Sequence, residues 1–136
     1  MRALQPATLA CVIAACSADS PPLIASNVVI TQPMPGAHMS AGYLALANSS
    51  GQAITITAVS SPDFESVEMH ESVLEDGVAR MHPLEEITIP PHQGVVFERG
   101  AKHLMLMRPV DAIDTVTLQF YAGDALVLSI NTTVGD

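Results

Sequence analysis

Short runs of β-forming residues, each ended by turn residues, constrain the fold of this chain more than any other feature. From Asn27 onward, Val, Ile, Thr and aromatic residues form segments that Gly, Pro, Asn and Asp interrupt about every ten positions. No long stretch combines a helical spacing of apolar residues with capping residues. The β-type runs cover residues 27–31, 41–48, 53–59, 66–71, 78–82, 86–90, 94–98, 102–107, 114–121 and 125–131. We therefore predict an all-β domain, folded as an antiparallel sandwich or a small barrel.

The first twenty residues differ from this pattern and resemble a secretory leader. Arg2 is followed by an apolar run over residues 3–15, which is too short to span a bilayer as a permanent helix. Residues 13–16 (IAAC) resemble the cleavage box of a bacterial lipoprotein, in which the Cys becomes the lipid-bearing first residue. We therefore predict a lipoprotein signal peptide at residues 1–16, with Cys16 lipidated. An ordinary leader cut nearby and a wrongly assigned start site are the alternatives.

The rest of the chain divides into a short tether and one domain. Residues 17–26 contain four polar residues and two prolines, which is typical of a flexible tether. Residues 27–136 form the predicted domain, and its length is sufficient for a single hydrophobic core. With this leader, the domain would lie in the periplasm or cell envelope and contact the membrane only through the lipid on Cys16.

The cysteine content and the charge exclude several kinds of site. Both cysteines, Cys11 and Cys16, fall in the predicted leader, so the domain contains no thiol. A disulfide framework, a zinc–thiolate site and a redox CxxC motif are therefore excluded, as is a blue-copper centre, which needs a Cys thiolate. The formal net charge of −9 would repel a phosphate backbone, which argues against nucleic acid as a partner.

Histidine and methionine, the soft metal ligands that remain, are concentrated in one part of the domain. They form Met69-His70, Met81-His82 and the alternating segment 103–107. In an extended strand, the His and Met residues of 103–107 point to one face and its leucines to the other, which is the natural core face. Thioether and imidazole together suit Cu(I) better than Zn²⁺, Ca²⁺ or Mg²⁺. The segment therefore indicates a soft-metal site on the outer face.

The spacing of these residues is similar to that of a known family. His70, ten intervening residues, Met81, twenty-one intervening residues and then His103-Leu104-Met105 resemble the motif of the periplasmic copper chaperones associated with the CuA centre of cytochrome oxidase, the PCuAC family. The resemblance covers nearly the whole domain, and its context includes residues 41–48, 69–71, 75–77, 89–91 and 100–107.

The resemblance implies a cupredoxin-like Greek-key β-barrel with one exposed Cu(I) site. His70, Met81, His103 and Met105 would be the four ligands, and the protein would be a monomeric metallochaperone rather than an enzyme. It would collect copper outside the cytoplasm and transfer it to an acceptor such as the CuA subunit of cytochrome c oxidase. Many relatives carry a His- and Met-rich tail for additional copper; residues 131–136 contain neither residue, so we expect a single site.

Two other functions remain open at this point. A copper-buffering or copper-tolerance lipoprotein would use the same ligands without a dedicated acceptor. A β-sandwich interaction module would bind another protein and no metal.

Four residues close to the predicted ligands have less specific interpretations. We expect Met69 and Met107 to pack against the fold rather than to bind metal. We expect His82 to face away from the site, and His92, which follows two prolines, to be exposed in a turn.

Two further groups allow either of two interpretations. Met34, His38 and Met39 either pack within a loop or bring one residue near the copper. The acidic run between Glu65 and Asp76 is either a solvated face or a docking surface for a basic acceptor.

Overall fold

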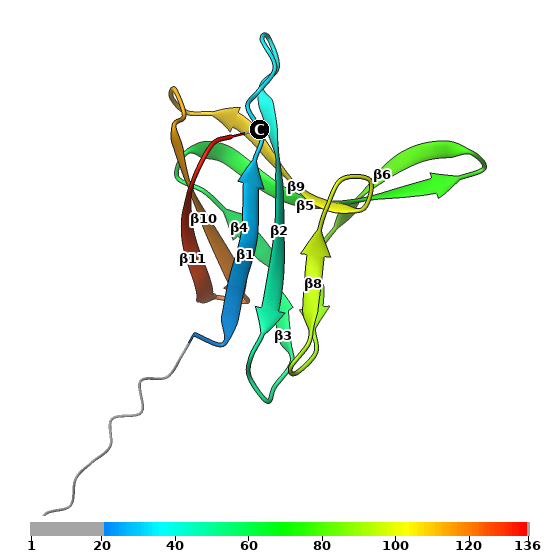
Figure 1. The fold of residues 1–136 in the computed structure, drawn as a ribbon, viewed down its shortest axis with the longest axis vertical. Helices are drawn as coiled ribbons and strands as arrows, with labels where there is room; N and C mark the ends of the chain where they lie inside the picture. The colour runs from blue at the N-terminus through cyan, green and yellow to red at the C-terminus, as the bar shows by residue number, and fades with distance from the viewer. Residues whose placement is uncertain (1–20, 136) are drawn as a thin grey trace, which may run out of the picture.

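The computed structural model describes residues 21–135, which fold into eleven β-strands without a helix (Figure 1). The strands are β1 (Leu23–Ile30), β2 (Met39–Asn48), β3 (Ile54–Ile56), β4 (Ala58–Ser60), β5 (Phe64–Glu75), β6 (Val78–Leu84), β7 (Ile87–Ile89), β8 (Gly94–Phe97), β9 (Lys102–Pro109), β10 (Thr115–Ala122) and β11 (Ala125–Thr133). Over this range no helix could cross a membrane. The predicted signal peptide and Cys16 lie outside the described residues. The prediction of an all-β domain is confirmed.

One nine-stranded sheet wraps into a nearly closed barrel. Its order is β1-β2-β9-β5-β4-β10-β11, with β6 beside β5 and β8 beside β2, while β3 and β7 form a separate pair. The two ends of this order meet, because Ile30 in β1 forms a parallel bridge with Val134 and accepts a hydrogen bond from the N–H of Gly135 (3.0 Å). Strands that are distant in the chain, such as β2 and β9, thus become neighbours, as in Greek-key topologies.

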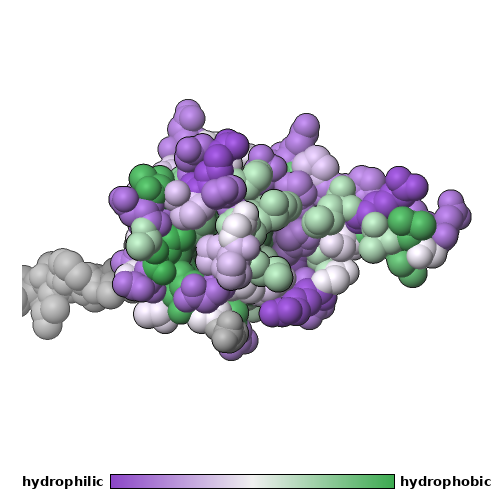
Figure 2. Space-filling view, turned by 90° about the horizontal axis from the view of Figure 1, so that it is seen from above, coloured by the Kyte–Doolittle hydropathy of each residue, from purple (hydrophilic) through white to green (hydrophobic). Residues whose placement is uncertain are grey.

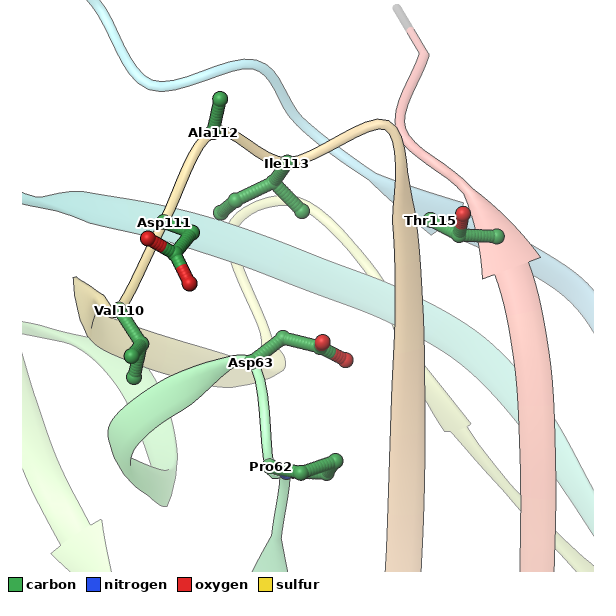
Figure 3. A pocket seen from close by; sticks show the side chains of 7 residues that line it. All are labelled: Pro62, Asp63, Val110, Asp111, Ala112, Ile113 and Thr115. Carbon is green, nitrogen blue, oxygen red and sulfur yellow. The ribbon is translucent and has the colours of Figure 1, made fainter.

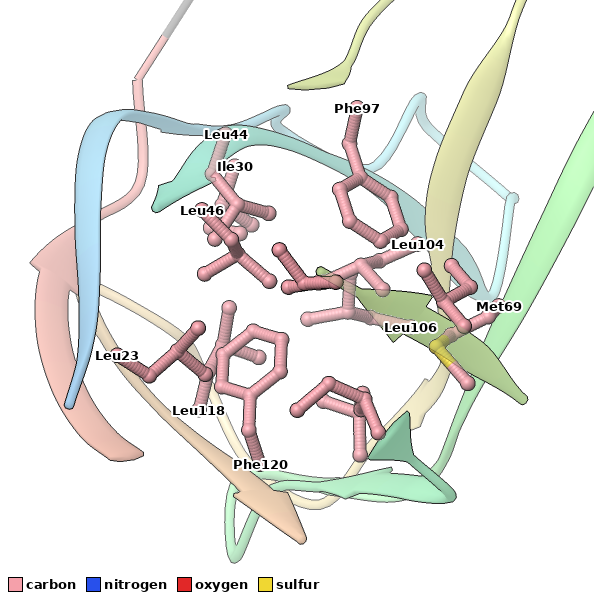
Figure 4. Close-up of a cluster of buried hydrophobic side chains, with 14 of the residues drawn as sticks. Leu23, Ile30, Leu44, Leu46, Met69, Phe97, Leu104, Leu106, Leu118 and Phe120 are labelled. Atoms are coloured by element: carbon pink, nitrogen blue, oxygen red, sulfur yellow. The ribbon is translucent and has the colours of Figure 1, made fainter. Parts of the chain in front are cut away.

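Alternation along the strands separates a core face from an outer face. Leu44 and Leu46 of β2 and Leu104 and Leu106 of β9 are all buried and point into the barrel (Figure 4). Phe120 of β10 packs in the same cluster. Burial of each such side chain stabilises the fold by roughly 1.5–3 kcal/mol. The leucines of β9 therefore fix which face of that strand remains outside.

Two strand boundaries differ from the sequence prediction. Leu23 is completely buried and begins β1, so residues 23–26 belong to the barrel and not to the predicted tether. The predicted strand over residues 53–59 is two strands, because the chain changes partner at Thr57. Residues before Thr57 pair with β7, whereas its own N–H donates to the carbonyl of Tyr121 in β10 (2.8 Å).

Strands β5 and β6 continue beyond the barrel as a projecting hairpin, which we call the arm (residues 72–82). The N–H of Ser72 still donates to the carbonyl of Ala101 (3.0 Å), and the rest of the arm pairs within itself. Figure 1 shows the arm extending sideways from the barrel, and Figure 2 shows hydrophobic side chains near its end. Leu74 and Val78 are exposed in that region. The arm therefore presents its side chains, including Met81, away from the core.

A buried asparagine ties the end of β2 to two loops. Asn48 is 2% exposed, and its Nδ2 donates to the carbonyls of Gln52 (2.7 Å) and Ile89 (3.0 Å). Its Oδ1 accepts from the N–H (3.0 Å) and the hydroxyl (2.7 Å) of Ser50. Because buried polar groups need partners, this side chain holds the loops that flank β3 and β7 in place.

Replacing Asn48 by Ala should lower the free energy of unfolding by about 2–3 kcal/mol, because buried groups lose their hydrogen-bond partners. Urea unfolding followed by circular dichroism measures the change. Gln52→Ala is the matched control, since Gln52 takes part in this network through its backbone carbonyl, and it should change stability by less than about 0.5 kcal/mol. Equal losses in the two variants would contradict the role given to Asn48.

Candidate metal centre

The pairing of β5 with β9 places two predicted ligands side by side. His70 and His103 are direct partners in the antiparallel register, and their ring centroids lie 5.9 Å apart with the planes inclined by 30°. Directly opposed residues of an antiparallel pair project to the same face of the sheet. The register therefore brings both imidazole rings to one place on the barrel.

The two predicted methionine ligands reach the same face through neighbouring positions. Met105 lies two residues after His103 in β9 and so shares its face. Met81 of β6 pairs with Ser72, which lies two residues after His70 in β5. All four side chains thus project from the outer face of the sheet, as expected from the alternation in residues 103–107.

Three of the four residues line one open groove. Met81, His103 and Met105 contribute to its wall, and its volume is about 760 Å³. His70 does not line this groove, and its ring lies against that of His103. The groove is therefore lined in part by β9 and the arm, and the His70 ring lies next to the His103 ring in its wall.

Another part of the groove lining comes from the loop between β1 and β2 and from the first residues of β2, the strand that pairs with β9. Met34, His38 and Met39 all line it. The sequence left open whether one of these residues would approach the predicted ligands. The structure places all three on the same groove, and only the long-range pairing of β2 with β9 could have revealed this.

Hydrogen bonding fixes which nitrogen of His103 is free. The ring is buried, with 8% of the residue exposed, and Nδ1 lies 3.0 Å from the carbonyl oxygen of Ala101. A carbonyl oxygen only accepts hydrogen bonds, so Nδ1 carries the hydrogen and, in the neutral ring, the lone pair is on Nε2. His103 is thereby oriented as a nitrogen donor through Nε2.

His70 has the opposite arrangement. Its Nε2 lies 2.9 Å from Oε2 of Glu68, a contact in which an ionised carboxylate accepts the hydrogen bond. The remaining nitrogen, Nδ1, is buried and has no hydrogen-bond partner among the described residues. A buried nitrogen with a free lone pair next to a second imidazole is chemically suited to hold a cation.

The two sulfur donors differ in accessibility. Met81 is 58% exposed on the arm, whereas Met105 is half-buried between β2 and β5. Both thioethers are uncharged, as are the two imidazoles in their neutral form. The four side chains therefore offer two imidazole nitrogens and two thioether sulfurs, all without charge.

The neighbouring residues lie where the sequence predicted. Met69 is 5% exposed and belongs to the hydrophobic core. His82 pairs with Glu71 in the β5–β6 register and so faces away from the groove, and His92 is exposed in a turn. Met107 is half-buried on β9 and does not line the groove.

The acidic run between Glu65 and Asp76 is partly neutralised. Its ion pairs are Glu65 with Arg108, Glu71 with Lys102 (2.8 Å) and Glu75 with Arg80 (3.1 Å). Half-exposed ion pairs of this kind contribute little to stability. That the run docks a basic acceptor stays a prediction.

A second, smaller pocket lies elsewhere and has a structural role. Figure 3 shows it where Asp63, before β5, faces the segment between β9 and β10. Asp63 accepts hydrogen bonds there from the N–H of Thr117 (2.8 Å) and the hydroxyl of Ser61 (3.4 Å).

Within residues 21–135, no three His, Cys, Asp or Glu side chains are grouped so as to hold a metal ion.

Comparisons with known proteins match the chain to one family model and to solved structures of the same fold. The family model for LpqE-like proteins, which its description calls lipoproteins, matches residues 23–134. No curated protein matches the sequence significantly.

Solved structures show the same fold. The copper(I) form of DR1885 from Deinococcus radiodurans is 27% identical with a TM-score of 0.62, and the match covers 88% of this chain and 82% of that one. The apo form of DR1885 is 26% identical with a TM-score of 0.60, covering 100% and 94%. The copper-bound PCuAC domain from PmoF2 is 21% identical with a TM-score of 0.64, covering 83% and 92%. These likenesses confirm the predicted cupredoxin-like β fold.

Proposed function

Because the chain belongs to the LpqE-like family and its structural neighbours include copper-bound PCuAC domains, we propose that it is a copper chaperone of the cell envelope. Its ligands are His70, Met81, His103 and Met105, and its cargo is Cu(I). The observation that carries this proposal is the direct pairing of His70 with His103 on the face that also holds the two methionines.

The donor set favours a soft monovalent cation. Thioether sulfur and neutral imidazole carry no charge to offset a hard divalent ion, and hard ions prefer oxygen ligands. Four neutral donors leave the bound Cu(I) with its single positive charge. Neutral donors and an accessible Met81 also allow release by ligand exchange, in which an acceptor group binds as a thioether leaves and the copper keeps its oxidation state.

The proposal also covers where the protein acts and which protein receives the copper. The description of the family as lipoproteins supports the envelope location, with Cys16 as the lipidated residue and the domain acting as a monomer. The acceptor is the CuA subunit of cytochrome c oxidase. The copper-bound neighbours are binding domains, and by this proposal the protein likewise binds and transfers an ion rather than catalysing a reaction.

Met81→Ala and His103→Ala should each abolish tight Cu(I) binding, because each removes one of four donors, while the domain stays folded. A protein that begins at Ser17 suits this measurement, since it keeps the complete described core, which begins at Leu23, and lacks both cysteines. Titration with Cu(I) against a competing chelator gives the affinity, and circular dichroism reports the fold.

His82→Ala is the matched control, because His82 lies next to Met81 but faces away from the groove. It should bind one Cu(I) as tightly as the unmodified protein. Retention of stoichiometric tight binding by both ligand variants would rule out this ligand set.

Glu68→Ala should weaken Cu(I) binding by roughly 10- to 100-fold, as expected when a carboxylate that orients a ligating imidazole is removed. The carboxylate contacts Nε2 of His70 and leaves Nδ1 as the donor. Glu71→Ala is the control, because Glu71 lies on the same strand but pairs with Lys102, and its affinity should stay within about twofold. An unchanged affinity in Glu68→Ala would show that His70 does not depend on this contact.

A chaperone with a dedicated acceptor and a copper-buffering protein would differ in the rate at which they transfer Cu(I) to the CuA domain. A chaperone loaded with Cu(I) should pass the ion to the isolated CuA domain faster than it releases it to a chelator at equal concentration, because docking permits direct ligand exchange. Spectroscopic assembly of the CuA centre measures the transfer. Transfer no faster than release to the chelator would favour the copper-buffering lipoprotein without a dedicated acceptor.

A further inference from the structure

All strongly exposed methionines among residues 21–135 lie on one groove. Met34 is 76% exposed, Met39 50% and Met81 58%, and each lines the groove beside His103. Methionine contributes to stability mainly when it is buried, so these exposed thioethers add little to the core. Their concentration at one place indicates a use for the sulfur.

The polarity of the first residues of β2 is inverted at this groove. Met39 pairs with Met107 on the outer face, whereas Ser40 pairs with Leu106 on the core face. Ser40 is 3% exposed, and its hydroxyl has no hydrogen-bond partner among the described residues. A buried unpaired hydroxyl costs roughly 1–3 kcal/mol. The strand thus directs its thioether to the groove although the reverse order would favour stability.

The loop before β2, which carries Met34 and His38, is held in a defined conformation. Met34 to Ala37 form a turn, in which the N–H of Ala37 donates to the carbonyl of Met34 (2.8 Å) and Gly36 has a φ of 81°. Pro35 and a glycine at positive φ are typical of a type II turn. At the end of the loop, the carbonyl of His38 accepts from the N–H of Arg108 (2.7 Å). These contacts hold the backbone of the loop in place and so limit where the side chains of Met34 and His38 can lie.

We propose that Met34, His38 and Met39 form a second, weaker Cu(I) site on the rim of the groove that Met81, His103 and Met105 also line. Two thioethers and one imidazole are a soft, neutral donor set that suits Cu(I) or Ag(I). The rim site is weaker because it offers three exposed donors, and the imidazole of His38 has no fixed partner among the side-chain hydrogen bonds of residues 21–135. The proposal rests on the proposed function only for the choice of ion.

The test is a titration of the protein that begins at Ser17 with Cu(I), and in parallel with Ag(I), followed by NMR of the methionine methyl groups. We expect two equivalents to bind. The first should shift the methyl signals of Met81 and Met105, and the second those of Met34 and Met39. A single equivalent that leaves the signals of Met34 and Met39 in place would overturn the rim site.

Variants separate the rim site from the first site. The double variant Met34→Leu with Met39→Leu keeps apolar volume without sulfur; it should lose the second equivalent and keep the first within about twofold. His103→Ala should do the opposite, so its result judges the proposed function alone. Met107→Leu is the matched control, because Met107 faces outward beside Met39 but does not line the groove. If the double variant bound the first Cu(I) as weakly as the second, Met34 and Met39 would belong to the same site as His103. That result would refute a separate rim site.

Discussion

The register between β5 and β9 is the constraint on which the candidate site depends. It sets His70 directly against His103, and a slip of one residue would turn the side chains of one strand to the opposite face. Such a slip would place an imidazole inside the barrel and expose Leu104 or Leu106, each of which is now completely buried. The hydrophobic core therefore keeps the face of the proposed metal site in register, although the predicted ligands make up little of that core.

The four proposed ligands divide into a fixed pair and an adaptable pair. Both imidazole rings have a hydrogen-bonded nitrogen, through Ala101 for His103 and through Glu68 for His70. Methionine has three rotatable bonds and a polarizable sulfur, so thioether donors adapt with little strain. For the copper chaperone that we propose, fixed nitrogens and movable sulfurs would allow one bond at a time to be exchanged. Met81 on the projecting arm is the most accessible of the four donors.

Much of this arrangement could be predicted from local patterns, and the rest depends on long-range pairing. The alternation in residues 103–107 predicts the outer face of β9, and the turn signals predict most strands. Local patterns do not predict the first residues of β1, because Leu23 follows two prolines and a polar segment and its burial depends on its pairing with Asn48. The break at Thr57 was missed for a similar reason, since a run of β-forming residues does not reveal a change of partner.

For the same reason, local patterns do not decide whether Met34, His38 and Met39 lie near the predicted ligands. Met39 and Ser40 are adjacent, and a hydrophobic pattern alone would place the Met inside and the Ser outside. The pairing with β9 reverses this order, because Ser40 lies opposite the buried Leu106. Departures from local preference of this kind are expected at functional sites, where a side chain is placed for its chemistry at the expense of stability. At the start of β2, stability and the proposed rim site would therefore make opposite demands on adjacent residues.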